Sequence, residues 1–264
     1  MKRFTICLTF AAMASLVMAQ SFTVFQNGKS QSFNDAAVDS IVFSENNVKE
    51  EAASSKARFI NARWCSLGTS ISWLNDNTAN YPITKGYQTR VLEKLGFVHF
   101  TNKAVNGGRI ESARAAVVLA DYYTIEHGIN DWGNTPVGTM DDYINNRNNG
   151  TFAAYYRQVI NQIFTRNPRA KVVLCTPRKA YGFNGYLPEH WYDPKNGIYL
   201  KEYADLVKQI AAYESFPVAD FFEECGGQRQ LKYLSYDEAL HPNDAGFQMM
   251  ANVLIQALEK VITE

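Results

Sequence analysis

The sequence predicts an α/β protein in which a parallel sheet is covered by helices on both faces. From about residue 58 onwards, apolar runs of strand length alternate with segments whose apolar residues recur at helical spacing. Right-handed crossovers between parallel strands place such helices on both faces of the sheet. The chain has 264 residues, which is enough for one domain of this kind with an appendage.

The first β-α unit begins just after residue 58. The stretch FINARWCSLG predicts a strand over residues 59–68. In PITKGYQTRVLEKLG, residues 82–96, apolar side chains recur every four residues, which predicts one face of a helix closed by Gly96. The apolar positions of this helix are Ile83, Tyr87, Val91 and Leu95.

The middle of the chain repeats the alternation. FVHFTNKAV predicts a second strand over residues 97–105, and IESARAAVVL a short helix over residues 110–119. DYYTIEHG, residues 121–128, predicts a third strand because aromatic and β-branched residues follow one another.

The last part of the chain supplies the remaining elements. A helix is expected over residues 151–164, and AKVVLCTP, residues 170–177, is the clearest buried strand. Another helix is expected over residues 200–213, a fifth strand in FPVADFFE, residues 216–223, and a final helix over residues 243–262.

The first 19 residues predict a cleaved secretory signal. Lys2 and Arg3 precede an apolar run, and small residues follow where a signal peptidase cuts. The run is too short to span a bilayer comfortably, and no later stretch reaches about 20 apolar residues. We therefore expect a secreted or periplasmic protein without a stable membrane anchor.

Residues 20–57 predict a small β-like segment followed by a linker. Two short β-like runs, residues 22–25 and 40–43, are separated by the turn formers Asn-Gly and Asn-Asp. The polar stretch NNVKEEAASSKA then ends near Ala57. The main domain is expected to cover residues 58–264.

Charge and cysteine content exclude some classes of function. Lys and Arg number 26, as do Asp and Glu, so no strong field attracts a polyanion and nucleic acid is not an expected partner. After the signal, Cys65, Cys175 and Cys225 match neither a disulfide framework nor a zinc site. Cys65 and Cys175 lie in apolar strands, and a bridge from either to Cys225 stays open. Neither a metal nor an organic cofactor is expected.

Polar residues follow the ends of several predicted strands, where the loops of a parallel sheet converge. A serine hydroxyl becomes a nucleophile only when a base takes its proton, and acyl transfer also needs donors aimed at the developing oxyanion. The loops that carry suitable groups are Gly68-Thr69-Ser70, Asn106-Gly107-Gly108, Gly128-Ile129-Asn130-Asp131 and the segment around His241.

These loops resemble, in order, the four blocks of the SGNH or GDSL-like esterase/lipase family. The blocks read GTSIS, NKAVNGG, HGIND and EALHPNDAG, and the resemblance covers about residues 58–262. It implies a flavodoxin-like three-layer α/β/α sandwich with a central, mostly parallel five-stranded sheet. It also implies that Ser70 is the nucleophile and His241 the general base. The implied oxyanion hole comprises the backbone N–H groups of Ser70 and Gly107 and the side-chain amide of Asn130.

Two positions depart from the family's pattern. Thr69 stands where an Asp usually precedes the nucleophile, although its hydroxyl can still cap the following turn. The family's acid usually lies three residues before the histidine, which favours Glu238, whereas Asp237 lies four before. Residue type favours Asp237, so both are candidates, with Glu238 preferred on spacing.

Aromatic residues near these blocks are candidates for substrate binding. Trp73 and Trp132 flank the nucleophile and oxyanion segments, although packing accounts for a Trp equally well. The segment 178–197 is long for a simple connection and rich in aromatic residues, which is typical of a binding wall. It contributes Tyr181 and Trp191 as candidates.

These observations favour a secreted serine esterase that transfers an acyl group to Ser70 and then to water. Secretion and the aromatic segment favour a carbohydrate O-acetyl ester or another small acyl ester as substrate. The alternatives are a lipase or lysophospholipase-type acylhydrolase, a noncatalytic glycan-binding protein on the same fold, and an adhesion role carried by residues 20–57.

Overall fold

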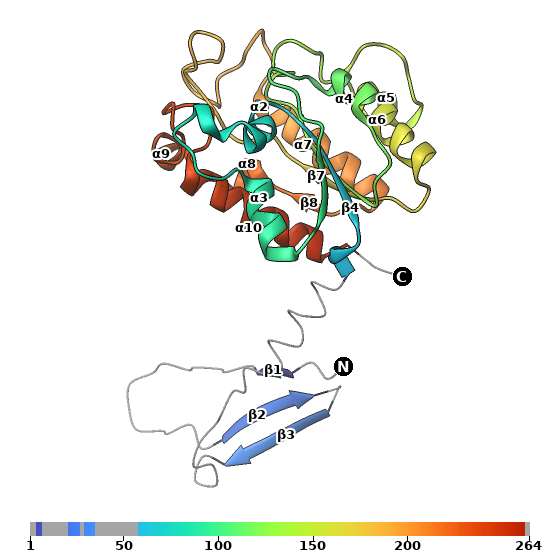
Figure 1. The fold of residues 1–264 in the computed structure, drawn as a ribbon, viewed down its shortest axis with the longest axis vertical. Coiled ribbons are helices and arrows are strands. Elements are labelled where there is room, and N and C mark those ends of the chain that lie inside the picture. Colours follow the sequence, from blue (N-terminus) through green and yellow to red (C-terminus); the bar gives the residue numbers. More distant parts are fainter. Residues whose placement is uncertain (1–3, 7–20, 27–28, 35–57, 262–264) are drawn as a thin grey trace. The chain divides into compact units, whose positions relative to one another are not determined.

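The computed structural model describes residues 4–6, 21–26, 29–34 and 58–261. The chain separates into two compact units, Met1–Glu51 and Ala52–Glu264 (Figure 1).

The first unit holds an antiparallel sheet in the order β1-β2-β3. Its strands are β1 (Phe4–Ile6), β2 (Ser21–Gln26) and β3 (Lys29–Asn34). β2 contains the first predicted run, and β1 falls inside the segment predicted as a signal. The second predicted run, residues 40–43, and the predicted linker lie outside the described residues.

The second unit is built on a five-stranded sheet in the order β5-β4-β6-β7-β8, in which every neighbouring pair is parallel. In chain order this is 2-1-3-4-5, the flavodoxin-like arrangement, so the predicted fold class is confirmed. Cys65 in the central strand pairs with Thr101 on one side and Tyr123 on the other. The strands are β4 (Arg63–Gly68), β5 (His99–Asn102), β6 (Tyr122–Glu126), β7 (Lys171–Cys175) and β8 (Val218–Ala219).

Helices cover both faces of this sheet (Figure 1). One face carries α3 (Tyr87–Leu95) and α10 (Asp244–Glu259), which pack against each other. The other carries α4 (Ile110–Ala116) and α6 (Phe152–Arg166), which form a second packed pair, together with α5 (Met140–Ile144) and α7 (Leu200–Glu214). Shorter turns are α2 (Ser70–Trp73), η2 (Leu74–Asp76), η3 (Thr78–Asn80), α8 (Phe221–Glu224), α9 (Gln228–Leu231) and η4 (Lys232–Leu234).

Element boundaries differ from the prediction where a cap decides them. The first large helix starts at Tyr87 because Gly86 is its N-cap, and it ends at Gly96, whose φ of +85° is the left-handed conformation that closes a helix. In the predicted fifth strand only Val218–Ala219 is extended, because the Asp220 carboxylate accepts the Glu223 N–H at 3.3 Å and starts a helix there.

The three cysteines of the second unit lie in its interior. β6 is buried along its whole length, and Cys65, Cys175 and Cys225 are buried free thiols, so neither bridge to Cys225 is formed. Burial raises the pKa of Cys65 to about 11 and that of Cys225 to about 12. These thiols act as small apolar side chains.

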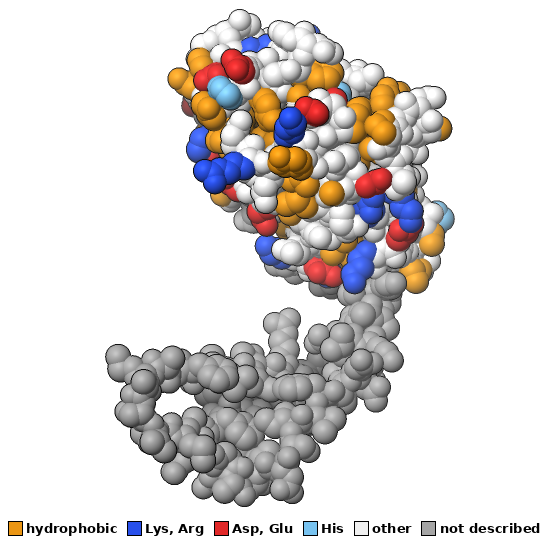
Figure 2. All heavy atoms as spheres, turned by 90° about the vertical axis from the view of Figure 1, so that its left-hand side faces the viewer, with side chains coloured by type: hydrophobic (Ala, Val, Ile, Leu, Met, Phe, Trp, Pro, Cys, Tyr) orange, Lys and Arg blue, Asp and Glu red, His pale blue; other side chains and the backbone are white. Residues whose placement is uncertain are grey.

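The surface of the second unit is mixed in charge. On the face drawn in Figure 2, basic and acidic side chains are interspersed rather than gathered by sign, in keeping with a formal net charge of zero. Within the described residues, none of the helices is long and apolar enough to cross a bilayer.

Candidate active site

Four loops meet at the carboxyl edge of the sheet and line one pocket of about 550 Å³. Ser70 follows β4, Gly107 follows β5 and Asn130 follows β6, three strands that are neighbours in the order β5-β4-β6. His241 comes from the loop before α10. The strand order reverses at this place, which is where open α/β sheets bind ligands.

Ser70 begins α2, and its neighbours fix that short helix. Thr69 is the N-cap, with its side-chain oxygen accepting the Ile71 N–H at 3.4 Å, as the sequence predicted. Gly68 is required for close approach, because a Cβ atom there would lie 2.3 Å from the Ser72 hydroxyl oxygen. The Ser70 side chain therefore projects from a fixed turn into the pocket.

Glu126, a buried carboxylate that sequence reasoning missed, holds α2 at its N-cap and at Ser72. Its Oε2 accepts from the Thr69 N–H at 3.2 Å, the Thr69 hydroxyl at 2.8 Å and the Ser72 hydroxyl at 2.9 Å. Burial raises the pKa of Glu126 to about 7, although the bonds from Thr69 and Ser72 act in the opposite direction. The only sequence signal was an acidic residue at the end of an apolar strand.

We expect Glu126 to make stability depend on pH. Its folded-state pKa lies above the ordinary 4.5, so the folded protein binds more protons than the unfolded chain between these values. The free energy of unfolding should fall as pH rises from about 5 to about 7, by on the order of 3 kcal/mol from this group. Glu126→Gln cannot ionise and should lose that part of the slope.

Urea unfolding of both proteins at pH 5 and pH 8 measures this difference. Asp131, whose pKa burial also raises to about 7, is present in both proteins, so the comparison isolates Glu126. Equal pH dependence in the two proteins would contradict the prediction.

Ser70, His241 and Asp237 form a hydrogen-bonded chain. The Ser70 Oγ and His241 Nε2 atoms are 3.0 Å apart, and His241 Nδ1 is 2.7 Å from Asp237 Oδ2. This is the arrangement in which a carboxylate orients an imidazole that can take a proton from a serine.

Asp237 also organises the backbone of its own loop. Its Oδ1 accepts the N–H groups of Ala239 at 3.1 Å, Leu240 at 2.8 Å and His241 at 3.1 Å. Burial, the largest single influence, pushes the pKa of Asp237 up, but the bonds from His241 and the backbone outweigh it and the pKa is lowered. The carboxylate is therefore held ionised beside the imidazole.

The preference for Glu238 as the partner of His241 is wrong. Its side chain is 70% exposed and lies 3.4 Å from Lys232 Nζ. Glu238 has a φ of +62°, a left-handed conformation that inserts one residue into the turn. As a result, the residue four before His241, and not the residue three before, reaches its Nδ1 atom.

A buried arginine fixes the loop that carries Asp237 and His241. The loop is closed by the Tyr236 N–H donating to the His241 carbonyl at 3.0 Å. Arg178, which is fully buried, donates to the Ser235 hydroxyl at 3.0 Å and to the Leu240 carbonyl at 3.3 Å. Burial lowers the pKa of Arg178 to about 10, so the side chain remains a cation at neutral pH. Its role was not visible in the sequence.

The residues predicted for the oxyanion hole lie on the same pocket as Ser70. Asn130 Nδ2 donates one hydrogen to the Gly108 carbonyl at 3.0 Å, and an amide nitrogen carries a second. Gly107 has a φ of +71°, which favours glycine. Asp131 accepts the Ile110 N–H at 3.2 Å, so it ties the Asn130 loop to the start of α4.

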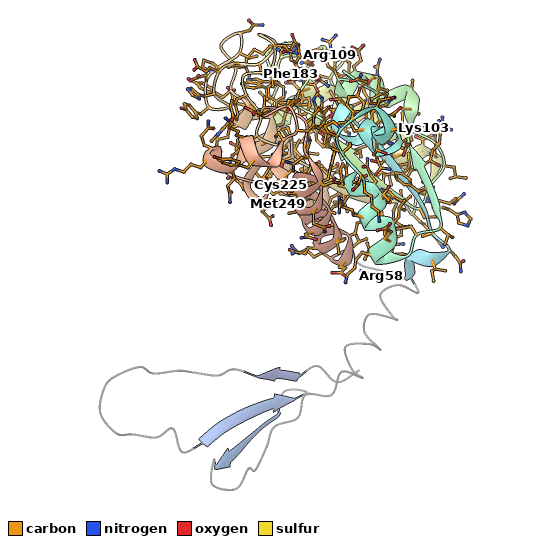
Figure 3. All side chains as sticks on the ribbon, turned by 60° about the vertical axis from the view of Figure 1, so that its left-hand side comes forward. Arg58, Lys103, Arg109, Phe183, Cys225 and Met249 are labelled. Atoms are coloured by element: carbon orange, nitrogen blue, oxygen red, sulfur yellow. The ribbon has the colours of Figure 1, made fainter. Side chains whose placement is uncertain are left out.

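Aromatic side chains form the wall of the pocket beside His241. The Trp73 and Tyr81 ring centroids are 6.3 Å apart, those of Tyr81 and Tyr236 5.8 Å, and Tyr236 stacks on His241 at 5.7 Å. Phe183, which Figure 3 shows at the loop end of the unit, meets His241 edge-on at 5.3 Å.

Only Trp73 among the four predicted substrate-binding residues lines this pocket. Trp132 is fully buried and donates its Nε1–H to the Ile198 carbonyl at 2.7 Å. Trp191 packs edge-on against Phe222 at 5.4 Å, and Tyr181 is not among the lining residues. The long segment 178–197 does reach the pocket, through Phe183 and Tyr186 instead.

In the part of the chain that the structure describes, no group of three or more His, Cys, Asp or Glu side chains is arranged to hold a metal ion.

Comparisons with known proteins agree with the fold described above. Residues 66–249 match the model of the GDSL-like lipase/acylhydrolase family. A crystal structure of a possible lipase from Chitinophaga pinensis is 26% identical, with a TM-score of 0.66, over 76% of this chain and 98% of that one. A protein from Lactobacillus plantarum shares the fold at 19% identity and a TM-score of 0.62, over 76% of this chain and 98% of that one. The comparison with curated protein sequences gives no match.

Proposed function

Since the chain belongs to the GDSL-like lipase/acylhydrolase family and is therefore an ester hydrolase, we propose that it is a secreted serine esterase acting on carbohydrate O-acetyl or other small acyl esters. The observation that carries the proposal is the chain of hydrogen bonds from Ser70 through His241 to Asp237, at 3.0 and 2.7 Å. The proposal that the protein is secreted rests on residues 1–19, whose sequence is typical of a signal peptide.

The reaction begins when His241 Nε2 takes the proton of Ser70 Oγ as that oxygen attacks the ester carbonyl. Asp237 holds the imidazole through Nδ1 and stabilises the imidazolium that forms. His241 then gives the proton to the leaving alcohol, and the acyl group remains on Ser70. A water molecule, deprotonated by His241, releases the acid and restores the serine.

The negative charge on the carbonyl oxygen develops beside Gly107 and Asn130. The second hydrogen of the Asn130 amide, with the N–H groups of Ser70 and Gly107, would donate to this oxygen. The Tyr186 hydroxyl, which also lines the pocket, donates to the Asn130 carbonyl at 3.4 Å and helps to hold this loop in place.

The walls of the pocket support a sugar ester rather than a long-chain lipid. Its volume of about 550 Å³ lies within the range that small-molecule sites occupy. Trp73, Tyr81 and Tyr236 offer flat faces together with polar tips, and such amphipathic rings suit a ring that is apolar on its faces and hydroxylated at its edge. A lipase would be served better by walls without these polar groups.

A serine-reactive fluorophosphonate probe tests the proposal. The probe should modify Ser70 covalently, since an activated serine attacks phosphorus as it attacks a carbonyl. Peptide mapping by mass spectrometry locates the label, and prior incubation with an acetate ester should slow labelling. An unlabelled Ser70 in folded protein would favour the rival reading, a noncatalytic glycan-binding protein on the same fold.

A further inference from the structure

Two open surface hollows lie in succession beside the active-site pocket. A hollow of about 340 Å³ adjoins the pocket and shares Asn106 and Gly107 with it. That hollow in turn shares Glu111 and Ser112 with a larger one of about 630 Å³ between α4 and α6. The shared residues place the larger hollow next in line from the pocket of Ser70, by way of the Gly107 loop. We call it the α4–α6 trough; its lining includes Ser112, Arg114, Asn146, Gln158, Asn161 and Gln162.

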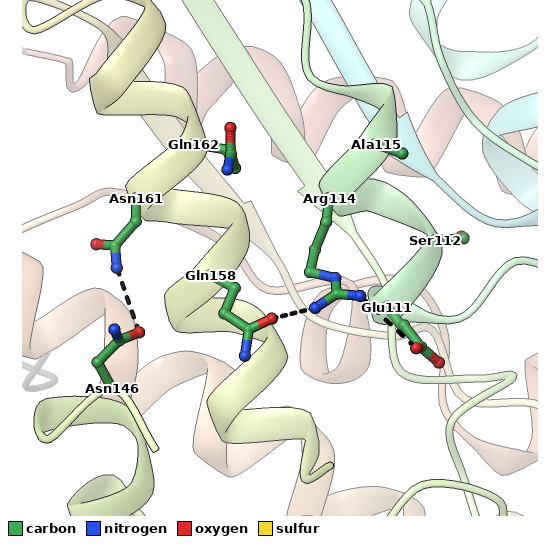
Figure 4. A pocket seen from close by; sticks show the side chains of 8 residues that line it. All are labelled: Glu111, Ser112, Arg114, Ala115, Asn146, Gln158, Asn161 and Gln162. Atoms are coloured by element: carbon green, nitrogen blue, oxygen red, sulfur yellow. Dashed lines mark hydrogen bonds and ion pairs between the residues drawn. The ribbon is translucent and has the colours of Figure 1, made fainter. Parts of the chain in front are cut away.

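The side chains of the α4–α6 trough are mostly neutral and hydrogen-bonding (Figure 4). Arg114 donates to Gln158 Oε1, and Asn161 Nδ2 donates to Asn146 Oδ1 at 3.3 Å. A side-chain amide carries two donor hydrogens and an oxygen with two lone pairs, so these pairs leave further donors and acceptors. A sugar hydroxyl, which both donates and accepts, matches such a surface.

Other ligands fit the trough less well. Among its ionisable groups, Arg114 lies 3.8 Å from Glu111, so the charges offset one another and offer no array of cations for a polyanion. Ala115 is the one apolar residue lining it, and the remaining apolar surface comes from the stems of polar side chains, which form no pocket for an acyl chain or for the side chains of a bound peptide.

A second surface hollow, which does not adjoin the pocket of Ser70, serves for comparison. It also measures about 630 Å³ and is lined by Arg90, Gln248 and Asn252 of α3 and α10 among others, with Arg90 donating to Gln248 at 2.9 Å. Like the α4–α6 trough it presents amide side chains beside an arginine, although Glu93, Lys94 and Ile255 also line it, and it shares no lining residue with the pocket of Ser70. It therefore supplies a matched control.

We propose that the α4–α6 trough binds the distal units of a neutral oligosaccharide whose ester lies at Ser70. This inference rests on the proposed function and narrows its substrate to esters on a polymeric, hydroxyl-rich chain. The sugar units near the ester contact the aromatic wall, and later units follow the Gly107 loop to Gln158 and Asn161.

The test measures kcat/KM on singly acetylated gluco- and xylo-oligosaccharides of one to six units, with p-nitrophenyl acetate as a short reference. In the wild type, kcat/KM should rise at least about tenfold from monomer to hexamer in one series, as expected when a few hydrogen bonds are added. The double variant Gln158→Ala/Asn161→Ala should lose this gain through KM while keeping its rate on p-nitrophenyl acetate.

The double variant Gln248→Ala/Asn252→Ala makes the same change on the control hollow and should keep the full gain. Alanine suits both helices, so folding should persist and circular dichroism checks it. Rates independent of length in both sugar series, or an equal loss in both double variants, would overturn the inference. So would a length effect seen with O-acetylserine peptides and not with sugars. Failure of p-nitrophenyl acetate hydrolysis itself would instead reject the proposed function.

Discussion

Ser70→Ala is expected to lower kcat for p-nitrophenyl acetate by about 10⁶, the loss that follows removal of a triad serine. Alanine cannot form the acyl-enzyme, so only the oxyanion donors and the binding pocket would continue to assist attack by water. Ser70 is the first residue of α2 and Thr69 remains as its cap, so the fold should be kept. Initial rates and circular dichroism measure the two effects separately.

Ser72→Ala is the matched control, because it removes a hydroxyl two residues further along the same helix. The Ser72 hydroxyl bonds to Glu126 at 2.9 Å and to Tyr87 at 2.6 Å, and Ser72 is not among the residues lining the pocket. Its loss should lower stability by about 1 kcal/mol and leave most of the activity. Comparable rates for the Ser70 and Ser72 variants would reject Ser70 as the nucleophile.

Much of the fold could be predicted because its interior strands are buried on both faces. β6 and β7 are interior strands, and their runs of aromatic, β-branched and aliphatic residues, YYTI and VVLC, stand out from the amphipathic helices. The short β8 was harder to bound, since a side-chain cap at Asp220 turns the aromatic run after it into α8. A side-chain cap of this kind favours a helix over an extended strand, and the apolar content of the segment does not show which of the two forms.

In the candidate site, too, some residues could be predicted from the sequence and others could not. The order of the four blocks brought Ser70, Gly107, Asn130 and His241 to one pocket because each block follows a strand of one parallel sheet. The aromatic wall had no such signal. Tyr81 and Tyr236 meet only through tertiary packing, and Trp132, close to Asn130 in sequence, is directed into the core.

The acid shows what spacing alone cannot decide. Counting back from His241 favours Glu238 only if every residue between them keeps the backbone conformation usual for such a turn. Glu238 instead has a positive φ, which is uncommon for a residue other than glycine and is maintained here by the bonds that Asp237 accepts from the three following N–H groups. The conformation is a property of the closed loop rather than of residue type.

Asp237→Asn should therefore lower kcat by about 10⁴, the effect of presenting His241 with the wrong tautomer. The asparagine oxygen can take the place of Oδ1 and still accept the N–H groups of Ala239 and Leu240, so the loop is retained. The amide nitrogen then takes the place of Oδ2, 2.7 Å from Nδ1, and donates where a carboxylate accepted. The imidazole must place its own proton on Nε2, which leaves it unable to receive one from Ser70.

Glu238→Gln makes the same chemical change one residue away and should alter kcat less than about twofold, because an exposed ion pair such as Glu238–Lys232 contributes little. Measuring both variants on one small ester, with folding checked by circular dichroism, separates the two acids. A large loss in the Glu238 variant with little change in the Asp237 variant would mean that the loop rearranges when substrate binds. Small losses in both would mean that another group orients His241. A large loss confined to the Asp237 variant would show that the negatively charged oxygen Oδ2 is needed beside His241 Nδ1. The backbone contacts made through Oδ1 survive the substitution, so their loss could not explain the effect.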